Sequence, residues 1–78
     1  MVKLFTMELA AFQLAFGARL TKAREAKELS FYALWQKTGV GASHIKAYEE
    51  GKENACLDSI RKLSIALEVP AKYFFDWE

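Results

Sequence analysis

The sequence predicts an all-α fold of five helices, and three observations support that prediction. Between Leu9 and Ala23 apolar residues recur at steps of three or four, which gives a helix one continuous apolar face. Ser30, Gly39 and Gly51 are residues that typically start or end helices, and they separate the periodic segments. No segment alternates apolar with polar residues and no Asn-Gly turn occurs, so strands and hairpins are not expected.

The chain is long enough for one small domain, residues 1–78. A domain of this size buries only about 60% of its unfolded surface, so its stability needs support. The single cysteine and single histidine exclude a tetrahedral metal site and an internal disulfide, and no cofactor is expected. Because 53% of the residues are hydrophobic and 14% aromatic, we expect support from a dense core and from a second copy of the chain.

The formal net charge of +1 argues mildly against tight non-specific binding to nucleic acid but leaves room for a local basic patch. Glu8 and Gln13 interrupt the apolar N-terminal segment, and no run of about 18 apolar residues is present, so neither a signal peptide nor a membrane span is expected. The unpaired Cys56 fits a reducing compartment. We therefore expect a cytoplasmic protein with no membrane partner.

The first two helices have clear signals of their own. The first is expected over about 7–27, with an apolar stripe of Leu9, Phe12, Phe16, Leu20 and Ala23. The second is expected over about 31–38, because Ser30 is a favourable N-cap and Gly39 a favourable stop.

The remaining helices follow the same logic. The third is expected over about 42–50, with Gly51 as its C-terminal stop. The fourth is expected over about 57–67, with an apolar stripe of Leu57, Ile60, Leu63, Ile65 and Leu67. Pro70, at a first helical position, is expected to open a short fifth helix of one or two turns.

The second and third helices carry a recognisable motif. The pattern consists of Leu34, Gly39, Val40, Ile45, Tyr48, Glu49 and Gly51, followed by the segment LDSIRKLSIALEVP. It resembles the Xre/Cro-type (lambda repressor-like) helix-turn-helix family of DNA-binding regulators, with the motif at about 31–50. The segment LEVPAKYFFDW further resembles the end of restriction-modification controller proteins, which are small dimers of this fold that pair through their terminal helices.

The resemblance implies a function and a partner. The chain would be a sequence-specific transcriptional regulator that binds double-stranded DNA as a homodimer, with its third helix in the major groove. On this sequence, the resemblance and the positions of the lysines imply these DNA contacts: Lys37, Ala42, Ser43, His44, Lys46, Ala47 and Lys52. His44 either reaches a phosphate or base edge or is an exposed polar residue. No Arg, Asn or Gln stands on the outer face of the third helix, so direct base readout should be modest.

Two further sets of residues are singled out. The family often pairs an Arg late in the first helix with a Glu at the end of the recognition helix, and Arg24 and Glu49 stand there; otherwise both are ordinary surface charges. The aromatic crowding within 69–78 is more than one small core should cover, which predicts a dimer interface. Its members are Tyr73, Phe74, Phe75 and Trp77.

The sequence also departs from the family pattern. Phe31 stands where a Gln is usual, Trp35 where a small residue is usual, and Glu28 where a Gly is usual. Phe31 and Trp35 are four residues apart and therefore share a helix face. Either both rings enlarge the core, or they form an aromatic face for a protein partner. The second possibility supports an alternative function as a protein-interaction module, antitoxin-like or anti-repressor, on a helix-turn-helix scaffold.

No catalytic constellation is present in the sequence. The acidic pair Glu49 and Glu50 has no accompanying nucleophile, second histidine or Gly-rich phosphate loop. We expect neither an enzyme nor a small-molecule ligand.

Overall fold

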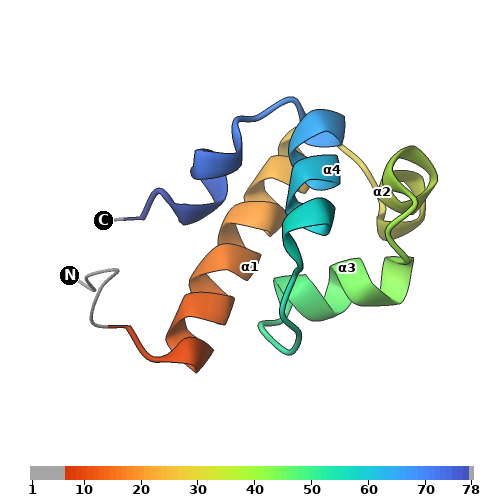
Figure 1. Ribbon diagram of the computed structural model, residues 1–78. Coiled ribbons are helices and arrows are strands. Elements are labelled where there is room, and N and C mark those ends of the chain that lie inside the picture. The colour runs from red at the N-terminus through yellow and green to blue at the C-terminus, as the bar shows by residue number, and fades with distance from the viewer. Residues whose placement is uncertain (1–6, 78) are drawn as a thin grey trace.

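The computed structural model describes residues 7–77, and this part of the chain consists of helices joined by short connections, without a strand. The elements are α1 (Leu9–Ala26), α2 (Phe31–Thr38), α3 (Ala42–Glu49), α4 (Leu57–Leu67) and the 3-10 helix η2 (Ala71–Phe75). Helix α1 runs through the middle of the molecule, with η2 on one side and the α2–α3 pair on the other (Figure 1). The all-α prediction is confirmed.

The fifth element differs from the prediction. It is a 3-10 helix of five residues rather than an α-helix, and Pro70 is its N-cap rather than its first residue. The backbone N–H of Tyr73 donates to Pro70 O at 2.9 Å, three residues back, which is the 3-10 pattern. The tighter winding accompanies the complete burial of Phe74, in the middle of η2, against α1.

Local signals set the ends of α2. The Ser30 hydroxyl oxygen accepts a hydrogen bond from the N–H of Ala33 at 3.0 Å. At the other end Gly39 adopts φ +78°, a left-handed conformation that costs glycine little, and its N–H donates to Trp35 O at 2.7 Å. The predicted bounds of α2 are therefore confirmed, as are those of α4.

One core holds the helices together. Its buried residues are Phe16, Leu20, Ala23, Leu34, Val40, Ile45, Tyr48, Leu63, Leu67 and Phe74. The predicted stripe of α4 was too wide, because Leu57 is 85% exposed and Ile65 is 65% exposed. An α-helix turns by about 100° per residue, so Ile65 points away from the side that buries Leu63 and Leu67. Leu57 is the first residue of the helix and lies about a quarter turn away from that buried side.

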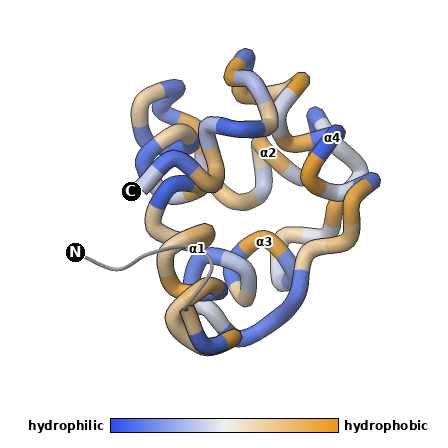
Figure 2. The backbone as a smooth tube through the Cα atoms, turned by 60° about the vertical axis from the view of Figure 1, so that its left-hand side comes forward, coloured by the Kyte–Doolittle hydropathy of each residue, from blue (hydrophilic) through white to orange (hydrophobic). Residues whose placement is uncertain are grey.

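Leu9, the first residue of the predicted α1 stripe, is also 63% exposed. Hydrophobic and hydrophilic residues are interspersed along every helix rather than gathered into one apolar segment (Figure 2). Within residues 7–77 no helix combines the length and apolar character that crossing a bilayer requires.

Candidate nucleic-acid interface

Helix α3 separates a buried side from an exposed side. Ile45 and Tyr48 are buried in the core, while Ser43 and Lys46 are exposed, with Ala47 half-buried beside them. The exposed side therefore carries a short hydroxyl, a methyl group and one flexible cation. It can make single hydrogen bonds and apolar contacts, but it offers no bidentate donor–acceptor pair.

The other predicted lysines are placed differently. Lys52 follows α3, and its Nζ lies 3.4 Å from Glu50 Oε1, so a neighbouring carboxylate offsets its charge. Lys37 lines a shallow hollow between α2 and α4 together with Lys62 and Glu68. The structure thus groups Lys37 with α4 residues rather than with the exposed side of α3.

His44, the third residue of α3, has a defined partner. Its Nδ1 lies 2.8 Å from Glu53 Oε1 and 2.9 Å from Glu53 Oε2, and 58% of its side chain is exposed. The ring also lies 6.5 Å from that of Tyr48, centroid to centroid. Sequence reasoning missed Glu53 because it lies in the connection after α3, where no periodicity relates it to His44.

A charged network fixes the C-terminal end of α3 to α1. Arg24 Nε donates to Glu49 Oε2 at 2.6 Å and Arg24 Nη2 donates to Oε1 at 3.0 Å, with only 14% and 7% of the two side chains exposed. The Thr21 hydroxyl donates to the same Oε1 at 2.8 Å. The hydrogen bond to Glu49 raises the pKa of Arg24. The pair is therefore a partly buried structural contact, and Thr21 is a member that the sequence did not suggest.

The backbones of α1 and α3 also touch. A Cβ placed on Gly17 would lie 2.5 Å from Tyr48 O and 2.6 Å from Glu49 O, too close for any side chain. A glycine in the middle of a predicted helix was the available sequence signal for this contact.

The two unusual aromatic residues of α2 do not form a common face. The guanidinium carbon of Arg24 lies 4.3 Å from the ring centroid of Phe31, which packs against the core. Trp35 is 40% exposed and makes an edge-to-face contact with Tyr32, which is 62% exposed, at 5.4 Å. The Phe31/Trp35 face considered from the sequence is thus corrected to a Tyr32/Trp35 pair, because Phe31 turns inward over Arg24.

The terminal aromatic residues are more covered than the sequence suggested. Phe74 is completely buried in its own chain, so it cannot take part in an interface as predicted. Tyr73, Phe75 and Trp77 are half-buried. Phe12 supplies much of that cover, with ring centroids 5.9 Å from Phe75 and 5.3 Å from Trp77. The chain therefore covers Phe74 completely and the other three rings only in part.

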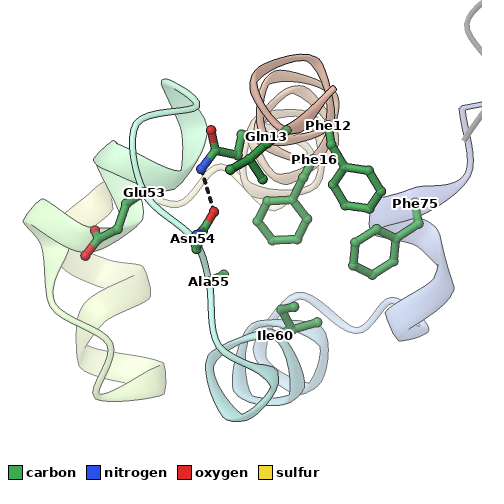
Figure 3. A pocket seen from close by; sticks show the side chains of 9 residues that line it. Phe12, Gln13, Phe16, Glu53, Asn54, Ala55, Ile60 and Phe75 are labelled. Atoms are coloured by element: carbon green, nitrogen blue, oxygen red, sulfur yellow. Dashed lines mark hydrogen bonds between the residues drawn. The ribbon is translucent and has the colours of Figure 1, made fainter. Parts of the chain in front are cut away.

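An apolar groove of about 200 Å³ lies beside these rings, between α1, the α3–α4 connection, the start of α4 and η2. The rings of Phe12, Phe16 and Phe75 and the side chain of Ile60 surround it, while a Gln13–Asn54 hydrogen bond spans one side (Figure 3). The groove can accept an apolar side chain from another molecule.

The remaining titratable groups include one exposed cysteine. Within residues 7–77 no cluster of His, Cys, Asp and Glu side chains could hold a metal ion. Cys56 is exposed at the N-cap of α4, and a hydrogen bond with the Ser59 hydroxyl lowers the pKa of its thiol.

Comparison with known proteins identifies the family. No family model and no curated protein sequence matches the chain. Among solved structures, it is similar to the crystal structure of the restriction-modification controller protein C.AhdI from Aeromonas hydrophila. The TM-score is 0.80 and the sequence identity 35%, over 83% of this chain and 98% of that one. At that identity and coverage the chain belongs to the restriction-modification controller proteins, within the Xre/Cro-type helix-turn-helix family.

Proposed function

We propose that this protein is a sequence-specific DNA-binding transcriptional regulator that acts as a homodimer in the cytoplasm and inserts α3 into the major groove. The observation that carries the proposal is the exposed side of α3, presented by a helix-turn-helix whose position is fixed by the Arg24–Glu49 pair. The likeness to a restriction-modification controller protein supports a role in gene regulation.

The proposed contacts between α3 and the DNA bases are few. Ser43 and Lys46 each provide one polar contact, and Ala42 and Ala47 can meet thymine methyl groups. His44 and Lys52 lie at the edge of the same surface, and Lys37 reaches a phosphate only if the duplex extends past α2. Specificity then depends largely on DNA shape and on the spacing of two half-sites.

For the dimer we propose an interface built on segment 69–78 and the apolar groove beside it. Tyr73, Phe75 and Trp77 remain available in part, and Leu57 is 85% exposed at the start of α4, next to the groove-lining Ile60. A two-fold arrangement would place the two α3 helices about 34 Å apart, one turn of DNA.

The DNA part is tested by selecting bound sequences from random duplex DNA and titrating the best one at several salt concentrations. We expect a logarithmic salt slope of about −4 to −6 and a Lys46→Ala variant whose slope is shallower by about 2 per dimer. Lys62→Ala is the matched control, because Lys62 lies on α4 and pairs with Asp58 at 3.1 Å. If no duplex binds better than bulk competitor DNA, the proposal is wrong.

The dimer part is tested by sedimentation at about tens of micromolar, a range in which interfaces of modest affinity are populated. Leu57→Glu should produce monomers without unfolding the chain, since its side chain is exposed. Ile65→Glu is the control, because Ile65 is similarly exposed on α4 but lines the hollow near Lys37 instead. Wild-type protein that sediments only as a monomer would contradict the dimer.

One observation favours a second candidate, a protein-interaction module. The Tyr32/Trp35 pair is an exposed aromatic contact on a helix-turn-helix element, where a small residue is usual at Trp35. If the selection yields no DNA, this pair becomes the first surface to test, with Trp35→Ala compared against wild type for capture of a protein partner.

A further inference from the structure

We infer that Glu53 is a positioning residue that fixes the ring of His44, so that His44 Nε2 accepts a hydrogen bond from the exocyclic amino group of a cytosine or an adenine. The inference rests on the proposed function, since it requires α3 to lie in the major groove. It adds a fixed tautomer of the His44 ring, which neither the motif nor the lysines specify.

The hydrogen bond determines the tautomer. Both carboxylate oxygens of Glu53 lie within 2.9 Å of His44 Nδ1. A carboxylate only accepts hydrogen bonds, so Nδ1 must carry the proton. A neutral imidazole has a single N–H, and Nε2 therefore carries a lone pair. A free imidazole in water favours the opposite tautomer, so Glu53 changes what the ring offers.

The ring is also held in place. Its Nδ1 is hydrogen-bonded to Glu53, and its centroid lies 6.5 Å from that of the Tyr48 ring. More than half of the His44 side chain is nevertheless exposed. Lys46, by contrast, is a flexible chain, and Ser43 is short. His44 is thus a rigid, directional group on the exposed surface of α3, whose preorganisation lowers the entropy lost on contact.

Its position on the helix suits base contact. His44 is the third residue of α3, and the N-terminal residues of a recognition helix are those that contact base edges. It lies at the edge of the exposed side, toward the connection that carries Glu53.

The lone pair has a defined complement in the major groove. Cytosine N4 and adenine N6 present donors, whereas guanine O6 and N7 and thymine O4 present acceptors. With Nε2 as an acceptor, the affinity should be about tenfold higher when the base that faces the ring is C or A than when it is G or T.

Glu53 and Tyr48 are the side chains that contact the ring.

The tautomer can be measured without DNA. His44 is the only histidine of the chain, so its ring nitrogens give unambiguous ¹⁵N NMR signals. In the neutral ring of wild type we expect a protonated Nδ1 and an unprotonated Nε2. Glu53→Gln should shift the population toward the Nε2–H form, because a carboxamide can donate as well as accept. A wild-type ring protonated at Nε2 overturns the inference.

The base preference is measured by selecting duplexes with wild type, Glu53→Gln and Glu50→Gln. Glu50→Gln is the matched control, since it removes the same charge from a carboxylate that contacts Lys52 rather than His44.

We expect wild type to prefer C or A at one position of each half-site. Glu50→Gln should keep this preference, and Glu53→Gln should reduce it to less than about threefold.

Two outcomes of the duplex selection would contradict the inference, and they can be told apart. If Glu53→Gln and Glu50→Gln raise the affinity equally and both keep the base preference, Glu53 acts only through its charge and has no positioning role. If wild type enriches no duplex at all, the proposed function fails together with the reading role, whatever tautomer the NMR signals report.

Discussion

The two sides of α3 are built very differently. On the inner side, backbone contact at Gly17, a hydrogen bond from Thr21 and an ion pair from Arg24 all meet the last turn of the helix. On the outer side stand a serine, a lysine and alanines, with His44 as the only side chain held by a partner from outside the helix. The chain therefore specifies where the helix lies far more strongly than what the helix reads.

This difference has a physical basis. Short side chains let a helix approach the floor of the major groove closely, and a fixed helix then tests whether the groove has the right width and spacing. Substitutions on the inner side should therefore change the stability of the fold, whereas those on the outer side should change only binding.

The largest effect is expected for Glu49→Gln. This change leaves the Arg24 guanidinium, only 14% exposed, without its ionic partner, and removing one member of such a pair costs about 3 kcal/mol. Urea unfolding followed by circular dichroism measures it. Glu50→Gln, one residue away and exposed, is the control and should leave the free energy of unfolding unchanged. An equal effect of the two changes would mean that the network contributes nothing.

The next largest effect is expected for Gly17→Ala. Its new methyl group would overlap the carbonyl oxygens of Tyr48 and Glu49, and the resulting shift of α3 away from α1 should cost about 2 kcal/mol. In most helices the same substitution stabilises by about 1 kcal/mol, so the sign itself is informative. Ala18→Gly, at the exposed neighbouring position, should lose about 1 kcal/mol from propensity alone. Stabilisation by Gly17→Ala would refute the close contact.

A smaller change of opposite sign is expected for Glu28→Gly. Glu28 adopts φ +55° after α1, where the family usually has glycine. Glycine relieves the strain of the left-handed conformation, but it loses more backbone entropy on folding. The net effect should stabilise the fold by about 0.5 kcal/mol. Thermal unfolding would show a slightly higher Tm, and Glu25→Gly, inside α1, should lower it instead.

The smallest effect on stability is expected on the outer side. Lys46→Ala should change the free energy of unfolding by less than about 0.5 kcal/mol, because its side chain is exposed and lies on the side of α3 away from the core. Its effect should appear only in DNA titrations. A clear loss of stability would show that the inner and outer sides are not separable.

Local chemistry explains which parts of the fold could be predicted. The cap at Ser30 and the left-handed stop at Gly39 act within a few residues, and α2 begins and ends where they indicate. The fifth element was predicted as an α-helix and is a 3-10 helix, since insertion of Phe74 into the core is not a local matter. The stripe of α4 was likewise overestimated at Leu57 and Ile65, because periodicity does not tell how far the core extends.

The contacts of the candidate site were less accessible to sequence reasoning. The Arg24–Glu49 pair was suggested only through the family pattern, whereas its Thr21 partner was not suggested at all. Glu53, nine residues after His44, carried no signal, since a charged residue in a connection is ordinarily solvated.

By itself, the sequence determined the helical class, most helix ends and the motif that assigns the family, because hydrophobic periodicity and capping act over a few neighbouring residues. Only the tertiary structure decided which side chains meet across the chain. Folding brings α1 against the end of α3, turns Phe31 inward over Arg24 and Trp35 outward beside Tyr32, and places Glu53 against His44. Such pairings depend on how whole helices pack, and that free energy is distributed over the entire core rather than encoded in any one segment.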